Sequence, residues 1–223
     1  MKIIEPKVEY EKYDGLKIMK KLERAMRQCY LSEGTTTEDS YKRLLGMAIS
    51  SNHGSVLEHE KITVRITSDI GFSKEITRHR AGTAFSVSST RYCNFSKGKF
   101  ENQIQILKPM ITGEAYKTWE KAMNQIEENY LEMAKNGAKP DVLRMILPHS
   151  TVSQMMMTAN IREWRHIFEL RCSKNAHPSC RQILIPLLLK FKEDMPELFE
   201  DIEYDTEFPK ELYAEISCME SEE

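Results

Sequence analysis

Helical and strand-like segments follow one another irregularly along the chain, and this order limits the possible folds more than any other sequence feature. The clearest helical segment is 115–136, where large apolar residues recur every three or four positions until Gly137 and Pro140 end it. Similar spacing predicts four further helices, over 14–30, 72–78, 160–172 and from 178 onward. Apolar alternations and runs predict three strands, over 62–66, 104–107 and 152–159. Because helices outnumber strands and do not alternate with them regularly, we expect an α+β fold, in contrast to a doubly wound parallel sheet.

Polar residues mark the ends of several predicted elements. Asp14 and Asn160 are placed to cap the helices that follow them. A capping box of the form Thr-x-x-Glu at 35–38 predicts a helix that reaches about Ser51. The stretch 81–92 is rich in serine, threonine and glycine, so we expect a loop that presents hydroxyls and backbone amides.

Composition and length indicate a globular protein. The chain has 223 residues, 40% of them apolar and 30% charged, without an internal repeat or a long linker. We therefore expect a single domain over 1–223, with a small, mostly antiparallel sheet flanked by long helices. The longest apolar stretch, 183–189, contains Pro186 and is far shorter than the roughly 20 residues of a membrane span.

The five cysteines are scattered, odd in number and without a CxxC pair. This pattern argues against a disulfide framework or a zinc knuckle. The N-terminal residues also show no apolar signal core. The sequence therefore predicts a cytoplasmic protein without a membrane partner.

Charge is unevenly distributed, although the formal net charge is only −2. Segment 73–99 carries six lysines and arginines against one acid, whereas 191–223 carries thirteen acids against two lysines. We expect this acidic C-terminal tail, 191–223, to be a solvated acidic face and the basic segment to meet an anion. A nucleic-acid-binding module is the alternative, but the sequence pI is about 6.3. Only Phe85, Tyr92 and Phe95 stand among the positive charges, which is few for base stacking.

The sharpest local motif is Arg78-His79-Arg80, followed eight residues later by the hydroxyl-rich segment 88–92, which contains Arg91. Guanidinium groups, hydroxyls and glycine-flanked amides together can bind a phosphate. The alternative reading is a basic surface loop with one histidine, because short motifs recur by chance.

A second cluster contains His53, Ser55, Glu58 and His59. Two histidines and a glutamate suggest zinc, but the spacing is not HExxH and no third ligand stands at a suitable offset. We therefore predict no metal here. A capped turn that leads into the strand 62–66 fits better, with Ser55 and Glu58 facing a ligand.

The third cluster lies on the predicted helix 160–172. Arg162 and His166 are one turn apart and share a face, whereas Arg171 lies nearly opposite Arg162 on an ideal helical wheel. Taken alone, the segment is better explained as an amphipathic helix whose apolar side packs and whose basic side faces water.

The three clusters together resemble the flavin-dependent thymidylate synthases. Further blocks that resemble the family follow in the same order, at 25–30, 143–148 and 171–178. The resemblance covers roughly residues 20 to 190. It implies methylation of dUMP at C5 with 5,10-methylenetetrahydrofolate as carbon donor, FAD as redox carrier and NADPH as reductant. It also implies small-molecule substrates, no nucleic acid, and a homotetramer in which several subunits build each active site.

The resemblance assigns roles to individual residues. Family positions that contact FAD correspond here to Ser55, Arg78, His79, Arg80, Asn160, Arg162 and His166. Positions that contact dUMP correspond to Glu75, Arg78, Ser88, Ser89, Thr90, Arg91, Arg144 and Arg171. Arg91 and Arg144 would neutralise the phosphate, while Ser89 orients its oxygens. Arg171 would be the catalytic residue, because a fixed cation at the uracil edge stabilises negative charge on the ring.

The chain also departs from the family pattern. Glu75 stands where many members have glutamine, Val87 replaces a polar residue, and Ser88 stands where glutamate is common. These departures leave open a divergent member that binds flavin and nucleotide without methyl transfer.

A cysteine nucleophile is a further alternative. Cys93 follows the serine–arginine motif and Cys172 follows Arg171, so both could have cationic surroundings. The resemblance assigns no catalytic cysteine, however, and free cysteine is more often a small buried hydrophobe. Ser89 has no evident general base beside it, so we interpret it as a positioning hydroxyl.

Overall fold

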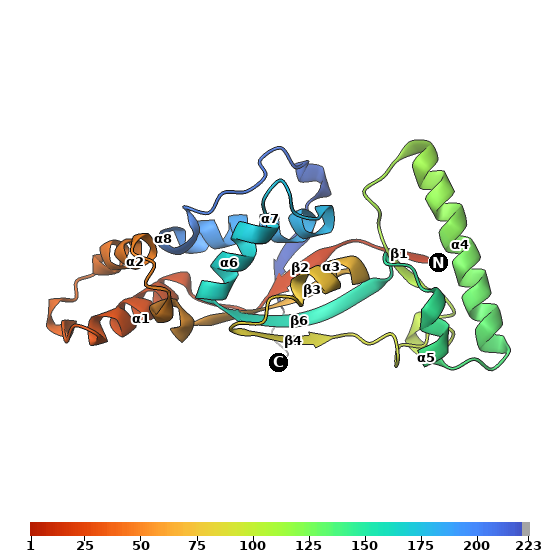
Figure 1. Ribbon diagram of the computed structural model, residues 1–223, viewed down its shortest axis with the longest axis horizontal. Helices are drawn as coiled ribbons and strands as arrows, with labels where there is room; N and C mark the ends of the chain where they lie inside the picture. The colour runs from red at the N-terminus through yellow and green to blue at the C-terminus, as the bar shows by residue number, and fades with distance from the viewer. Residues whose placement is uncertain (220–223) are drawn as a thin grey trace.

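A five-stranded sheet forms the centre of the computed structural model, which describes residues 1–219 (Figure 1). From edge to edge its strands are β4 (Thr83–Val87), β6 (Val152–Asn160), β3 (Lys61–Asp69), β2 (Lys7–Tyr10) and β7 (Glu215–Cys218). All neighbouring pairs are antiparallel except β2 and β7. A separate parallel pair joins β1 (Lys2–Ile4) to β5 (Gln105–Leu107). The main sheet is therefore small and mostly antiparallel, as the sequence predicted.

The two long central strands form because one face of each is apolar. In β3, Ile62, Val64 and Ile66 are buried, whereas Arg65 between them is exposed. β6 pairs with β3 along its whole length, from Asn160 opposite Lys61 to Val152 opposite Asp69. This long register fixes the end of β6, and α6 begins at the next residue.

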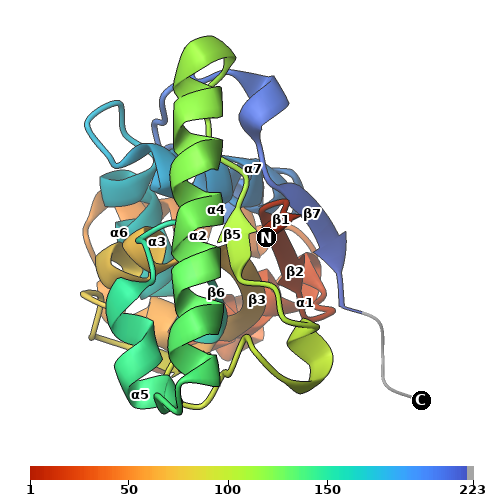
Figure 2. The same cartoon turned by 90° about the vertical axis from the view of Figure 1, so that its right-hand side faces the viewer.

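Helices lie along one side of the sheet and at both of its ends (Figures 1 and 2). Over the described residues they are α1 (Gly15–Gln28), α2 (Ser40–Ser50), α3 (Ile70–Ile76), α4 (Gly113–Lys135), α5 (Pro140–Leu143), α6 (Ile161–Arg171), α7 (Pro178–Asp194) and α8 (Pro196–Phe199). Short 3-10 turns are η1 (Glu33–Thr35), η2 (Gly54–His59), η3 (Gly98–Phe100), η4 (Arg144–Ile146) and η5 (Lys210–Leu212). None of the helices within residues 1–219 combines the length and the apolar composition that a membrane crossing requires.

Helix α4 stands at the opposite end of the molecule from α1 and α2 (Figure 1). It packs on a smaller hydrophobic cluster of its own, in which the Tyr130 hydroxyl accepts a hydrogen bond from the Phe95 amide at 3.3 Å. The sequence predicted this helix over 115–136. Its helical periodicity could be recognised because the apolar stripe is unbroken.

Side chains cap the starts of α1, α3, α6 and α7, the last through His177. Asp14 accepts a hydrogen bond from the Lys17 amide at 3.0 Å, and Asn160 accepts one from the Glu163 amide at 2.8 Å. Both predicted caps are confirmed. Asp69 caps α3 at the Phe72 amide, so α3 begins two residues before the predicted helix.

The capping box predicted at 35–38 does not form. Helix α2 begins only at Ser40, with Asp39 as its N-cap residue. The Thr35 hydroxyl accepts a hydrogen bond from Arg27 at 2.7 Å and donates one to the Ser32 carbonyl, so it is occupied elsewhere. The buried Arg27 side chain thus binds the hydroxyl that the capping box would have used.

Part of the predicted loop 81–92 is the edge strand β4. Residues Thr83–Val87 pair with Met155–Ala159 of β6 in regular antiparallel register. Ala84, Ser86 and Val87 are exposed, so this strand lacks the apolar alternation that identifies a strand in sequence. Its partner strand supplies the hydrogen bonds that define it.

The C-terminal segment has an exposed acidic face, as the sequence predicted, because most of its acidic side chains up to residue 219 are exposed. Its apolar side packs on the body of the protein through buried residues that include Leu198, Phe199, Ile202, Phe208 and Ala214. Pro186 lies inside α7 and has no amide hydrogen for the Gln182 carbonyl, which instead accepts a hydrogen bond from the Ala214 amide at 3.0 Å. The buried Asp205 accepts a hydrogen bond from Arg181 at 2.6 Å. This one buried acidic residue therefore pairs with α7.

Phe191 of α7 is the centre of the aromatic core. Its ring lies 5.2–5.8 Å from the rings of Tyr13, Trp164, Phe168 and Phe199. These rings come from the segment before α1 and from α6 and α8, so one side chain joins four segments of the chain.

Replacing Phe191 with alanine should lower the free energy of unfolding by about 3–5 kcal/mol, because it removes a fully buried ring and leaves a cavity. Phe191→Leu should cost clearly less, because more of the volume is kept. Urea unfolding followed by circular dichroism measures both. A loss below about 1 kcal/mol for the alanine variant would contradict the central place of this ring.

Candidate active site

Two cavities lie at opposite ends of the edge strand β4. The larger, of about 720 Å³, adjoins Ala81 and Gly82 just before the strand, and residues of α2, η2 and α6 line its other sides. The smaller, of about 370 Å³, adjoins Val87 and Ser88 at the end of the strand and is also lined by α3 and by Arg144. A five-residue strand spans about 17 Å. The strand therefore separates the two cavities by roughly its own length.

In the larger cavity, Asn160 stands at the junction of β6 and α6. Its Oδ1 caps α6, while its amide nitrogen lies against Gly82, where a Cβ atom would come within 2.2 Å of that nitrogen. Gly82 also has φ +66°, which favours glycine. Arg162 and His166 line the same cavity one turn apart, so the predicted shared face is confirmed.

Each of the four carboxylates that line the larger cavity has a basic side chain as its partner. Glu58 pairs with Arg162 at 2.7 Å, and Arg165 pairs with Asp201 at 2.7 Å and with Glu169 at 3.8 Å. The fourth carboxylate, Glu163, pairs with His79 at 2.8 Å.

Unpaired positive charge lies in the turn beside this cavity. Arg78 and Arg80 are exposed, and neither has an ion-pair or hydrogen-bond partner for its side chain within residues 1–219. Free guanidinium groups favour an anionic ligand.

The smaller cavity has the character of an anion site. Ser88, Ser89, Thr90 and Arg144 line it, as the nucleotide assignment requires, and among the described lining residues none is acidic. Lys74 adds a second cation, whose Nζ lies 3.2 Å from the His149 Nε2 atom.

Sequence reasoning missed four polar residues that line this cavity, namely Ser73, Lys74, Thr77 and Ser153. Lys74 could have been found, because it precedes Arg78 by one helical turn. Thr77 is half-buried at the end of α3, and its hydroxyl donates to the Ser73 carbonyl at 2.7 Å.

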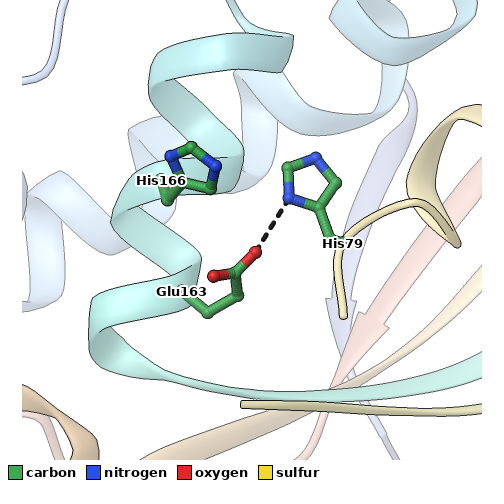
Figure 3. A group of neighbouring side chains, drawn as sticks. All are labelled: His79, Glu163 and His166. Carbon is green, nitrogen blue, oxygen red and sulfur yellow. Dashed lines mark hydrogen bonds and ion pairs between the residues drawn. The ribbon is translucent and has the colours of Figure 1, made fainter. Parts of the chain in front are cut away.

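His79 does not line either cavity but lies buried behind the larger one, with 5% of its surface exposed. It projects from the segment between α3 and β4 toward α6, where Glu163 and His166 face it (Figure 3). Its Nδ1 lies 2.8 Å from Glu163 Oε1, and its Nε2 accepts a hydrogen bond from Arg171 Nε at 3.1 Å. Both ring nitrogens are thus engaged within the chain.

Arg171 is bound on three of its nitrogens. Besides His79, its Nη1 donates to Glu75 Oε2 at 2.6 Å and its Nη2 donates to the Glu75 carbonyl at 3.0 Å. Each Nη keeps one further N–H, and 17% of the side chain is exposed. The predicted residues Glu75, His79 and Arg171 are therefore brought together in one group.

The ligand atoms of His79, Glu163 and His166 lie within 4.8 Å of one another, a spacing that could hold a metal ion. The hydrogen bonds argue against this use. One nitrogen of His79 donates to a carboxylate, the other accepts from a guanidinium, and a cation would meet the positive charge of Arg171. We therefore assign His79 and Glu163 to the hydrogen bond that they form with each other.

The remaining predicted residues are exposed or half-buried. Ser55 lies exposed in η2, and the guanidinium of Arg91 lies over the Tyr92 ring at 5.7 Å. Neither residue lines one of the two cavities. His53 and His59 are also exposed, and they do not belong to the group with metal-like spacing.

The two cysteines considered as nucleophiles differ in their surroundings. Cys172 is fully buried, and this burial raises the pKa of its thiol well above the usual value. A thiolate is therefore disfavoured there, which argues against Cys172 as a nucleophile. Cys93 is half-buried beside a small third cavity of about 190 Å³.

Replacing Gly82 with alanine should displace Asn160 and weaken the cap of α6. The left-handed backbone and the lost cap each contribute about 1–2 kcal/mol of destabilisation. Gly113→Ala is the matched control, because Gly113 also has a positive φ of +64° but its added Cβ meets nothing within 4 Å. Thermal unfolding of both variants checks this, and equal melting temperatures would contradict the close approach of Gly82 and Asn160.

Acid should destabilise the folded chain through His79. Burial and the charges of Arg171 and His166 hold the pKa of His79 below its usual value, although the Glu163 hydrogen bond acts in the opposite direction. The unfolded chain therefore takes up the proton first, near pH 6.5, and the free energy of unfolding falls as the pH drops below that value.

The control for this prediction is His79→Gln, which lacks the titrating ring. Urea unfolding at pH 7.5 and pH 5.5 should show wild type losing more stability than this variant on acidification. An equal or smaller loss in wild type would show that His79 is not held neutral in the folded chain.

Comparison with known proteins identifies the family. The family model described as "Thymidylate synthase complementing protein" matches residues 16–197. A flavin-dependent thymidylate synthase of Geobacter sulfurreducens is 28% identical over 184 residues, which cover 79% of this chain and 78% of that protein.

Two solved structures share the fold. Thymidylate synthase X of Helicobacter pylori, solved with FAD and dUMP, superposes with a TM-score of 0.72 at 20% identity, covering 88% of this chain and 98% of that one. The UMP/dUMP methylase PolB of Streptomyces cacaoi, bound with 5-Br dUMP, gives a TM-score of 0.74 at 20% identity, covering 90% and 96%. The family model spans most of the chain, and the chain therefore belongs to the flavin-dependent thymidylate synthase family.

Proposed function

We propose that this chain methylates C5 of dUMP to give dTMP, with FAD as redox cofactor, 5,10-methylenetetrahydrofolate as carbon donor and NADPH as reductant. The observation that carries the proposal is the smaller cavity, which combines two cations and several hydroxyls and contains no carboxylate among its described lining residues. A nucleotide monophosphate needs such a site, because its phosphate is close to a dianion at neutral pH. Family membership supports the same reaction.

FAD fits the larger cavity by the chemistry of its lining. Asn160, Arg162 and His166 offer hydrogen-bond donors there, and Arg78 and Arg80 beside it offer unpaired charge for a diphosphate. Ser55 in the neighbouring turn adds a hydroxyl. When bound, FAD carries electrons from the reductant to the one-carbon unit.

We assign His79 a role that differs from the one implied by the family resemblance. The resemblance makes it a flavin contact, but both of its ring nitrogens already have partners within the chain. We propose that it supports the site from behind, through Arg171, while Arg80 supplies the direct contact with FAD.

For the nucleotide, we assign the phosphate to Arg144 and Lys74, with hydroxyls of Ser88, Ser89 and Thr90 orienting its oxygens. Arg91 is exposed at the end of the same segment and adds charge. Lys74 extends the set of residues expected from sequence. Loss of one such charge-assisted contact weakens binding by about 1.5–3 kcal/mol.

Arg171 is assigned to the pyrimidine ring. Its two remaining N–H groups can pair with carbonyl oxygen, and Glu75 and Arg78 lie on the neighbouring segment. A preorganised guanidinium stabilises negative charge that develops on the uracil ring when C5 is activated. The C5 hydrogen then leaves as a proton once the new carbon is attached.

We further propose a cytoplasmic homotetramer in which several copies build each site. Tyr92 and Met145 have 78% and 79% of their surfaces exposed, and they adjoin the site residues Arg91 and Arg144. Large apolar side chains beside a binding site favour coverage by a neighbouring copy. The five free cysteines suit a reducing compartment.

The proposal is tested by product formation. Protein loaded with FAD should convert dUMP to dTMP and release tritium from [5-³H]dUMP when 5,10-methylenetetrahydrofolate and NADPH are supplied, whereas omission of the folate or of NADPH should abolish dTMP formation. Arg171→Ala should lower the rate about 10²–10³-fold while FAD stays bound, and Arg171→Lys should restore little, because lysine lacks the planar fork.

The alternatives give different results. A yellow protein that binds dUMP but forms no dTMP would be the divergent family member without methyl transfer. A colourless protein that binds neither FAD nor dUMP would overturn the proposed function.

A further inference from the structure

Glu163 is a buried carboxylate to which neither the sequence nor the proposed function gives a role. It lies in the first turn of α6, its backbone amide is capped by Asn160, and 7% of its surface is exposed. Within residues 1–219 its side chain has one hydrogen-bond partner, the Nδ1 atom of His79 at 2.8 Å (Figure 3). A buried carboxylate requires a donor, so this contact fixes a proton on Nδ1.

The other side of the same ring leads to Arg171. His79 Nε2 accepts from Arg171 Nε at 3.1 Å, and a nitrogen that accepts a hydrogen bond carries no proton. His79 is therefore neutral, with its proton on Nδ1. Its depressed pKa agrees with this state, since the charges of Arg171 and His166 act against protonation.

The geometry of α6 allows Glu163 and Arg171 to contact the same His79 ring. Glu163 and Arg171 are eight residues apart on α6, which is about 12 Å along the axis. Their positions on the helix are about 80° apart, so both side chains can reach the same imidazole. Glu75 holds the other edge of the Arg171 guanidinium at 2.6 and 3.0 Å.

We propose that Glu163 is a positioning residue that orients Arg171 through His79, by fixing the imidazole tautomer whose Nε2 lone pair binds the Arg171 Nε–H group. Without the carboxylate, the proton can move to Nε2. Two N–H groups would then face each other, and the guanidinium would lose one of its two anchors. The functional part of this inference rests on the proposed role of Arg171 toward the nucleotide, whereas the tautomer itself does not.

Two substitutions separate the hydrogen bond from the charge. Glu163→Gln removes the charge but keeps an oxygen that can accept from Nδ1, whereas Glu163→Leu removes both while keeping much of the volume. If Glu163 acts through the tautomer, the glutamine variant should retain most of the wild-type behaviour and the leucine variant should not.

The first measurement is magic-angle-spinning NMR of the flavin-loaded protein labelled with ¹⁵N-histidine, with the His79 signals assigned by difference from His79→Asn. Wild type and Glu163→Gln should show a protonated Nδ1 and an unprotonated Nε2, and Glu163→Leu should shift toward a protonated Nε2. An unchanged tautomer in Glu163→Leu overturns the proposal. This readout does not depend on catalysis, so it remains decisive if the proposed function fails.

The second measurement is a double-mutant cycle on the nucleotide-dependent oxidation of reduced flavin. Glu163→Leu should slow this step about 10- to 100-fold, and reduction of the flavin by NADPH should change much less. Glu163→Leu combined with Arg171→Ala should be no slower than Arg171→Ala alone, because both act through one guanidinium. Additive losses would overturn the proposal, since they would show that Glu163 acts independently of Arg171.

Discussion

The direct passage from β6 into α6 at Asn160 determines where the candidate site lies. β6 is held on both sides by β3 and β4, so its last residue has a fixed position, and Asn160 begins the helix there without an intervening loop. The close approach of Gly82 to the same side chain places the turn before β4 against this junction. α6 consequently projects Arg162 and His166 into the larger cavity from a rigid base.

The same helix organises a second set of contacts on another of its faces. Glu163 near its start and Arg171 at its end both bind His79, and Arg171 also binds Glu75 of α3. Buried polar groups are satisfied here, which favours a single arrangement of the guanidinium. The exposed cations Arg78, Arg80 and Arg144 have no such partners among residues 1–219. The paired side chains thus form the framework of the candidate site, and the unpaired guanidinium groups are free to contact a ligand.

Local patterns predicted the local structure well. Features that depend on residues close in sequence could be predicted. They are the unbroken apolar stripe of α4, the caps at Asp14 and Asn160, and the apolar alternation in β3. Local sequence patterns did not predict the edge strand β4 or the packing of the C-terminal segment. β4 is defined by its hydrogen bonds to β6, and the C-terminal segment depends on a carbonyl that Pro186 leaves free.

Within the site, the sequence identified residue types better than their contacts. Arg162 and His166 could be placed on one face by helical spacing, and the hydroxyls of 88–90 do line the smaller cavity with Arg144. The pairing of His79 with Glu163 joins residues 84 positions apart, and no local pattern encodes it. The interpretation of His79 as a direct flavin contact therefore came from resemblance, and the packing suggests a supporting role instead.

We propose that the two cavities serve one reaction, with flavin in the larger and nucleotide in the smaller. A titration of the FAD-loaded protein with dUMP, followed by the visible difference spectrum of the flavin, tests it most directly. We predict a saturable spectral change in wild type, and a midpoint raised about 10-fold or more in Arg144→Ala, which loses a charge-assisted contact. A flavin spectrum that stays unchanged while calorimetry shows dUMP binding would contradict the claim.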